Sequence, residues 1–241
     1  MIRNPMDWQE VASLDQLSAQ AAEILLATIR EHPTTVLGLP TGRTPLGMYG
    51  QVVADCSRQY HCFSGVTTFN LDEYVGLPRT HPASYFSYMK QHLFDHVDIA
   101  PERIHIPDGD ASDPAAECVR YETAISQAGG LDLTILGLGR NGHIGFNEPG
   151  TPFDSRTRVV TLSDSTRRAN ADFFPDRSVP TQAMTMGIAT ILSSKRIVLL
   201  AGGTGKQEAI ERLHQAFVDR DFPASALWTH KNVTVLVAPS G

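Results

Sequence analysis

The sequence has few cysteines, no long apolar run and no cluster of basic residues. Its cysteines, Cys56, Cys62 and Cys118, are scattered and form no C-x-x-C pair, which is typical of free thiols in a reducing cytoplasm. No apolar run reaches the ~18 residues of a membrane span, and the N-terminus lacks the apolar core of a signal peptide. The net charge is -6 without a lysine or arginine run, so nothing indicates nucleic-acid or membrane-surface binding. We therefore expect a cytoplasmic protein.

The composition, 41% hydrophobic and 19% charged over 241 residues, is that of a folded globular protein. No internal repeat, low-complexity segment or linker divides the chain, so we expect a single domain over residues 1–241. A capping box at Ser13–Gln16 opens an amphipathic helix. Further helices are predicted from Pro45 and over 83–95, 114–127, 181–193 and 205–218. Strands are predicted over 35–40, 66–71, 131–138, 158–162, 195–202 and 232–239.

Strands separated by helices predict an α/β fold with a mostly parallel sheet and helices on both faces. Ligands of such sheets bind beyond the carboxyl ends of the strands. The loops after residues 40, 71, 138 and 202 are therefore where a binding site is expected.

The stretch 137–150, GLGRNGHIGFNEPG, begins with the G-x-G-x-x-G spacing of a dinucleotide-binding turn. That turn must lead into a helix, whose N-terminus holds the pyrophosphate. Here two more glycines and a proline follow, which disfavours a helix, so we reject a nicotinamide cofactor. The loop also carries His143, with Asn141 and Glu148 close by in sequence. Such partners set the tautomer of a catalytic histidine, and an ordinary surface histidine is the alternative.

Two glycine-containing loops have the features of phosphate sites. The first, Thr41-Gly42-Arg43-Thr44, precedes a helix, so backbone N–H groups and two hydroxyls form an anion cradle. A strand-to-helix turn without a ligand is the alternative. The second loop, GGTGKQ at 202–207, places Lys206 at a helix start, which suits a single phosphate group. It lacks the first glycine and the final hydroxyl residue of a Walker A loop.

Asp72 and Glu73 follow the strand at 66–71. Strand alternation points them in opposite directions, so only one can face a site. A carboxylate near apolar surface can remove a proton from carbon, and two solvated acids are the alternative. His92 and His96 lack a third ligand at metal-site spacing, so we expect no metal. Taken together, the residues indicate a phosphorylated small substrate, an acid–base pair of Asp72 and His143, and no cofactor, as in aldose–ketose isomerisation.

Six segments carry a resemblance to a known family: GLPTGRTPLGMY, FNLDEYVGL, HPASYF, GLGRNGHIGFNEPG, SRTRVVTL and VPTQAMTMGIATIL. Over residues 36 to 240 they resemble the glucosamine-6-phosphate deaminase family. The resemblance implies a Rossmann-like α/β fold that works without metal or nucleotide. It also implies conversion of glucosamine 6-phosphate and water to fructose 6-phosphate and ammonia.

The resemblance also implies roles for individual residues. Asp72 matches the base that moves a proton between C2 and C1 through an enolamine. His143 matches the acid–base group of ring opening, assisted by Glu148 and position 141. That position is often aspartate in the family. Asn141 can orient His143 but adds no charge, so more of the charge support falls to Glu148. The matches to the phosphate site are Thr41, Gly42, Arg43, Thr44 and Lys206.

The segment 163–174 matches a mobile lid of the family. Family members commonly carry a phosphate-binding arginine in it, where this sequence has Asp172. A carboxylate at that position would repel phosphate. Arg43, and Arg168 one helical turn before Asp172, are candidate replacements.

Longer, hexameric relatives have an allosteric site built partly from a C-terminal extension. This sequence stops at Gly241 and has Val160 where those relatives have a lysine, although Arg158 remains. We therefore expect a monomer without an allosteric response. The nearest alternative function is that of 6-phosphogluconolactonase, which has a similar fold and a similar G-x-G-x-x-G-H stretch. The other alternative function is that of a sugar-phosphate sensor, as in some transcriptional regulators. The sequence has no helix-turn-helix segment or basic arm that would support it.

Overall fold

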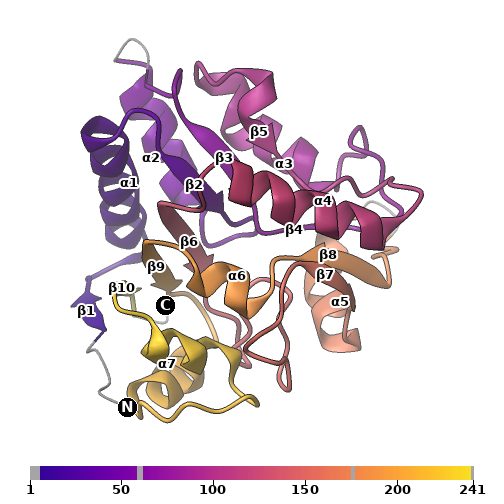
Figure 1. The fold of residues 1–241 in the computed structure, drawn as a ribbon. Coiled ribbons are helices and arrows are strands. Elements are labelled where there is room, and N and C mark those ends of the chain that lie inside the picture. Colours follow the sequence, from indigo (N-terminus) through magenta and orange to yellow (C-terminus); the bar gives the residue numbers. More distant parts are fainter. Residues whose placement is uncertain (1–5, 59–61, 175–176, 240–241) are drawn as a thin grey trace.

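The computed structural model describes residues 6–58, 62–174 and 177–239 (Figure 1). A seven-stranded sheet with the order β1-β10-β9-β6-β2-β3-β5 forms its centre, and every pairing in it is parallel. The predicted α/β fold with a parallel sheet is confirmed. The strands of this sheet are β1 (Asp7–Glu10), β2 (Val36–Leu39), β3 (Thr67–Asn70), β5 (Ile104–His105), β6 (Leu133–Gly137), β9 (Arg196–Ala201) and β10 (Val233–Val237).

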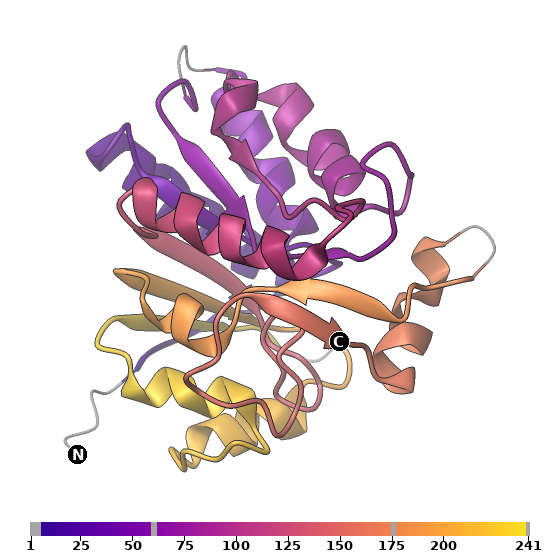
Figure 2. The same cartoon turned by 45° about the vertical axis from the view of Figure 1, so that its right-hand side comes forward.

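Helices cover both faces of the sheet, as predicted. Alternate side chains of each strand enter different cores. Leu37 of β2 packs with residues of α1, α2 and α3, whereas Val36 packs with residues of α4, α6 and α7. In Figure 2 the N-terminal helices and α7 lie on opposite sides of the sheet. The helices are α1 (Leu14–Glu31), α2 (Leu46–Cys56), α3 (Tyr85–His92), α4 (Pro114–Gln127), α5 (Asp164–Asn170), α6 (Ile188–Leu192) and α7 (Gln207–His214).

A second, three-stranded sheet has the order β4-β8-β7 and consists of β4 (Asp72–Tyr74), β7 (Arg158–Thr161) and β8 (Gln182–Thr185). The prediction of a helix over 181–193 is therefore wrong for the first half of that segment, which forms β8. β8 pairs antiparallel with β4 on one side and β7 on the other, and two ladders of backbone hydrogen bonds outweigh a local helix preference. The helix begins only after Gly187, which is the N-cap of α6.

Two other predictions need correction. The helix predicted over 205–218 ends at His214, because Ala216 has a left-handed φ of 55° that stops it. Cys56 and Cys62, expected as free thiols, form a disulfide. Their Cα atoms are 5.5 Å apart, within the range that a disulfide spans, and nothing in the linear spacing reveals this approach. Cys118 is free, as expected, and it is buried.

No helix in the described part of the chain is both long and apolar enough to cross a membrane. Within the same residues, no group of three or more histidine, cysteine, aspartate or glutamate side chains could hold a metal ion. His92 ends α3, and His96 ends the short 3-10 helix at Phe94–His96. The His96 ring contacts the carbonyl of Gln91 at 2.9 Å.

Candidate active site

The four loops predicted to carry a site meet at one edge of the main sheet. β9, β6 and β2 are neighbours, and the carboxyl ends of parallel strands open onto the same edge. The loops at 202–206, 138–150 and 40–45 therefore lie side by side. The chain after β3 continues at this edge into β4 of the small sheet, which carries Asp72.

Asp72 is the first residue of β4, and its carboxylate is buried. It lies opposite Thr185 of β8. The loop that carries His143 packs against it at Gly145, where an added Cβ would lie 3.6 Å from Asp72 Oδ2. Burial, and then the neighbouring Glu73 carboxylate, raise the pKa of Asp72 to about 8. A carboxyl group that titrates near neutral pH is suited to general base catalysis.

Glu73 has a different surrounding from Asp72, as strand alternation predicts. Its carboxylate accepts hydrogen bonds from the N–H groups of Tyr74 (2.9 Å), Tyr85 (3.0 Å) and Phe86 (3.0 Å). The last two belong to the first turn of α3, so Glu73 caps that helix. Burial raises the pKa of Glu73 to about 7. Among the described residues no hydrogen bond reaches the Asp72 carboxylate, whereas Glu73 is bound by three backbone N–H groups.

His143, Asn141 and Glu148 form a chain of hydrogen bonds. Asn141 Nδ2 donates to Glu148 Oε2 at 2.7 Å, and Asn141 Oδ1 lies 2.7 Å from His143 Nδ1. Because an ionised carboxylate can only accept, it orients the Asn141 amide with its oxygen toward His143. That oxygen also only accepts, so Nδ1 carries the proton and Nε2 is left as a proton acceptor.

Glu148 is the expected charge partner of His143, and Asn141 lies between the two side chains. Burial lowers the pKa of His143. The Glu148 charge acts against this shift, and the nearby Lys206 adds to it. His143 is therefore held mainly neutral at neutral pH, the form that can accept a proton.

Two of the three glycines in the G-x-G-x-x-G stretch have a local steric cause, whereas an added Cβ on Gly137 would meet nothing within 4 Å. An added Cβ on Gly139 would lie 2.3 Å from Nδ1 of His143, and one on Gly142 would lie 2.2 Å from the ring of Phe222. The residues after these glycines form turns rather than a helix, so the predicted loop is confirmed. The glycines make room for the two rings.

Two cations meet at the neighbouring loop. Lys206 is the N-cap residue of α7, and its Nζ donates to the carbonyl oxygen of Leu138. Arg140 lies beside the preceding residue, Gly205, where an added Cβ would be 3.0 Å from Arg140 Nε. Burial, and then the charge of Arg140, lower the pKa of Lys206 to about 8. The loops after β6 and β9 therefore bring two cations together in a protein whose net charge is -6.

The loop 41–44 turns at Gly42, whose φ of 101° is in the left-handed region that favours glycine. The Gly42 carbonyl accepts a hydrogen bond from Tyr88 at 2.6 Å, and the Thr41 side chain hydrogen-bonds to Tyr85. Thr44 leads into Pro45, which caps α2 without a side-chain hydrogen bond. The first N–H groups of α2 can therefore serve an anionic ligand. α2 begins at Leu46, one residue after the predicted start at Pro45, which is the N-cap instead.

Arg43 reaches from this loop to the predicted lid, which consists of α5 and a 3-10 helix at Ala171–Phe173. It forms an ion pair with Asp172 at 3.3 Å, and its guanidinium lies 5.4 Å from the centre of the Phe173 ring. Arg177 pairs with the same carboxylate at 3.1 Å. Asp172, expected to repel a phosphate, is thus neutralised by two arginines.

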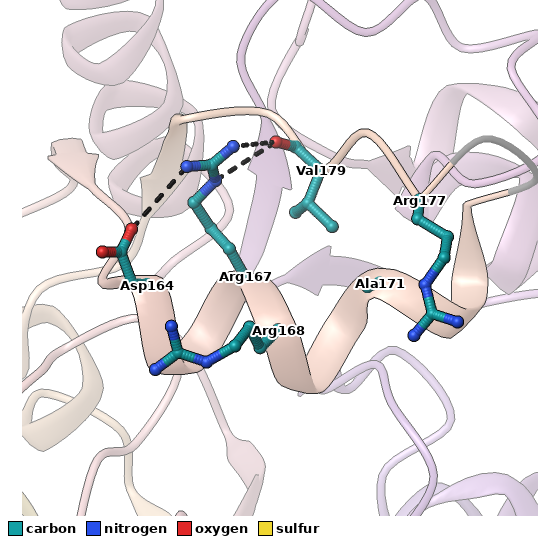
Figure 3. Close-up of a pocket in the computed structure, with 6 residues that line it drawn as sticks. All are labelled: Asp164, Arg167, Arg168, Ala171, Arg177 and Val179. Carbon is teal, nitrogen blue, oxygen red and sulfur yellow. Dashed lines mark hydrogen bonds and ion pairs between the residues drawn. The ribbon is translucent and has the colours of Figure 1, made fainter.

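Arg168, the other candidate phosphate ligand, lies on the exposed surface of α5. It lines a pocket of about 210 Å³ together with Arg167 and Arg177. In Figure 3 the Arg168 side chain extends toward the N-terminal end of α5, whereas Arg167 turns to the carbonyl of Val179. No carboxylate of the described residues pairs with Arg168. The three guanidinium groups of this pocket point in different directions, so they do not form a clamp for one anion.

Three residues near the site were not predicted from the sequence. Arg140 lies within the GLGRNGH segment, and its position between two glycines and close to His143 could have indicated it. Tyr85 joins two parts of the site, because its hydroxyl group contacts Thr41 and also Tyr74 at 3.2 Å. Thr166 of α5 hydrogen-bonds to Glu148 and so ties the lid to the histidine loop. The last two contacts join segments far apart in sequence, so no local pattern reveals them.

The fold and the site together are those of an acid–base enzyme for a small anionic substrate. The chain belongs to the family described as glucosamine-6-phosphate isomerases/6-phosphogluconolactonase, whose model matches residues 9–236.

Similar proteins lie within that family. The chain is 52% identical to the glucosamine-6-phosphate deaminase of Lysinibacillus sphaericus over 96% of its own length and 98% of that protein. It is 51% identical to a solved structure described as a monomeric glucosamine-6-phosphate deaminase, with a TM-score of 0.95 and 97% coverage of both chains. The 6-phosphogluconolactonase of Trypanosoma cruzi has a TM-score of 0.80 at 18% identity, covering 98% of this chain and 96% of that one, and so shares the fold.

Proposed function

We propose that this protein is a glucosamine-6-phosphate deaminase, which converts glucosamine 6-phosphate and water to fructose 6-phosphate and ammonia. One observation carries the proposal: the buried Asp72 carboxylate packs against the loop that holds His143 in a defined tautomer. This arrangement supplies two proton-transfer groups for neighbouring atoms of one substrate. The 52% identity to a deaminase supports the same reaction.

The role of Asp72 follows from its environment. In the open-chain sugar the C2 proton is acidified by the C1 aldehyde, and the Asp72 carboxylate removes it. The resulting enolamine takes a proton back at C1, which leaves an imine at C2. Addition of water to C2 and loss of ammonia then give the ketose. Burial keeps the pKa of Asp72 at about 8, so the same group can accept and return the proton near neutral pH.

His143 opens the sugar ring before this step. Its Nε2 is free to take the proton of the C1 hydroxyl and to pass it to the ring oxygen as the bond from C1 to that oxygen breaks, because Asn141 holds the imidazole proton on Nδ1. The positive charge that develops on the imidazole is stabilised by Glu148 through Asn141. All three residues come from the single loop after β6.

The phosphate group of the substrate binds between the loops 41–44 and 202–206. The N-terminus of α2, the hydroxyls of Thr41 and Thr44, and Lys206 supply the donors. Arg43 and Arg168 are additional candidates. Arg43 must first leave Asp172, whereas Arg168 is unpaired among the described residues. The proposed reaction requires no cofactor.

Release of ammonia on addition of glucosamine 6-phosphate tests the proposal. A deaminase releases one ammonia for each fructose 6-phosphate formed. A 6-phosphogluconolactonase would instead hydrolyse a sugar-phosphate lactone, and a sensor would bind the sugar phosphate without turnover. Either of those results would overturn the proposed function.

We also propose that the protein acts as one domain, as a monomer in the cytoplasm, without a nucleic-acid partner. The similarity to a monomeric deaminase supports the monomer. Arg158, the remaining positive residue of the allosteric position, donates to Asn147 at 2.8 Å and to Thr151 at 3.4 Å. It is thus already engaged within the chain. Hyperbolic kinetics and a monomer mass in solution are the expected observations.

A further inference from the structure

Arg140 and Lys206 form a pair of like charges at the carboxyl edge of the main sheet. Arg140 comes from the loop after β6, and Lys206 from the loop after β9. The guanidinium lies against Gly205, at 3.0 Å (Nε) and 3.2 Å (Cζ) from the position of an added Cβ. Its charge also acts on the ammonium group of Lys206, whose pKa is lowered mainly by burial and then by Arg140.

Neither cation is neutralised by a carboxylate of the described residues. Other arginines of the protein have such a partner: Arg43 and Arg177 pair with Asp172, and Arg212 pairs with Asp219. Lys206 donates only to the uncharged carbonyl of Leu138. The exposed Arg140 and the half-buried Lys206 therefore have no acidic partner there, in a protein that has more acidic than basic residues.

Two cations held close together repel each other, and partial burial of one of them increases the cost. An anion that lies between them removes this repulsion and forms charge-assisted hydrogen bonds to both. The N-terminus of α7 adds the partial positive charge of the helix dipole. Its N-cap residue, Lys206, makes no side-chain hydrogen bond to the first N–H groups of the helix. The arrangement is thus prepared for a compact, multiply charged anion.

We propose that Arg140 binds the phosphate group of the substrate together with Lys206. This inference rests on the proposed function, since it assigns a second cationic ligand to the same substrate. The strand order supports the geometry: β6 stands between β9 and β2, so Arg140 projects from the middle of the three loops that surround the phosphate. It needs no rearrangement of an ion pair, unlike Arg43.

Steady-state kinetics of Arg140→Gln with glucosamine 6-phosphate test the proposal. We expect KM to rise about ten-fold or more, as for loss of a charge-assisted hydrogen bond, while kcat stays within about two-fold because the reacting carbons are not touched. Arg140→Lys keeps the charge and should retain most of the affinity. Arg196→Gln is the matched control, because Arg196 begins β9 at the opposite edge of the sheet and its loss changes the net charge equally.

Inorganic phosphate gives a second readout that does not depend on turnover. Its dissociation constant, measured by calorimetry on the intact protein, should rise for Arg140→Gln and stay unchanged for Arg196→Gln. Unchanged KM and unchanged phosphate affinity in Arg140→Gln would overturn the inference, as would a loss confined to kcat. If the wild-type protein released no ammonia while Arg140→Gln still weakened phosphate binding, the proposed function would fail and the assignment of Arg140 as a phosphate ligand would stand.

Discussion

Arg43 and Asp172, which are 129 residues apart in sequence, form an ion pair at 3.3 Å that joins the loop after β2 to the lid. The contact between Arg43 and the Phe173 ring reinforces it. Both charged side chains are more than half exposed, so the pair contributes little to overall stability. Its consequence is local: the lid carboxylate and an incoming phosphate compete for the same guanidinium.

Asp172→Asn should release Arg43 for the phosphate. We expect a KM for glucosamine 6-phosphate a few-fold lower than that of the wild type, and a higher KM for Arg43→Gly, since a guanidinium forms charge-assisted bonds to phosphate. Asp164→Asn is the matched control, because Asp164 is a lid carboxylate that pairs with Arg167 instead. A higher KM for Asp172→Asn would show that the ion pair itself is needed to hold the lid, and would contradict this competition.

Glu148 and Asn141 should act as one unit on His143, because Glu148 reaches the imidazole through the Asn141 amide. Each of Glu148→Gln and Asn141→Ala is expected to lower kcat at least about ten-fold, since each removes support from the imidazolium that forms during ring opening. The double variant should lose little more than the worse single variant. Measured kcat losses that multiply would show that the two residues act independently.

Glu73→Gln should make Asp72 a stronger acid. The Glu73 charge is the second cause, after burial, of the raised pKa of Asp72. The rise of kcat/KM with pH, which reports ionisation of the base near pH 8, should therefore move to lower pH in the variant. The helix cap is largely kept, because Tyr74 and Tyr85 both donate to a single oxygen, Oε1. Glu117→Gln is a control, and an unmoved pH profile in Glu73→Gln would contradict the coupling.

Asp72→Asn should stabilise the protein at high pH. The folded state holds the carboxyl proton up to about pH 8, far above the ordinary pKa of 3.8. The contribution of this carboxyl group to the free energy of unfolding is therefore fully present below about pH 4 and is lost as the pH rises to about 8. Asparagine cannot ionise, so we expect Tm of the variant to exceed that of the wild type by several degrees or more at pH 9. The two values should converge near pH 4. A difference that is independent of pH would contradict the raised pKa.

The layered fold could be predicted from the sequence because its strands are short apolar runs separated by helical patterns. β9 and β10 are examples, and their side chains enter the two cores alternately. The small antiparallel sheet could not be predicted in this way. β8 has a helical local pattern, and only pairing with β4 and β7 makes it a strand. The disulfide also depends on the three-dimensional approach of Cys56 and Cys62.

Some contacts of the candidate site could likewise be predicted from the sequence, and others could not. His143, Asn141 and Glu148 lie within one loop, so their sequence spacing indicates their contact. The partners of Arg43 and Lys206 come from other loops and could not be found from spacing. A family resemblance identifies positions such as Asp72, but it cannot say that Asp172 is paired with two arginines.

The transfer of the C2 proton shows most directly whether Asp72 is the catalytic base. Glucosamine 6-phosphate is incubated with the wild-type protein and with Asp72→Asn in D₂O, while ammonia, fructose 6-phosphate and exchange of the C2 proton are followed. We expect equal amounts of ammonia and fructose 6-phosphate from the wild type. For Asp72→Asn we expect exchange and turnover to fall by about 10²–10⁴, as for loss of a general base. Near-normal exchange of the C2 proton in Asp72→Asn would show that Asp72 is not the base.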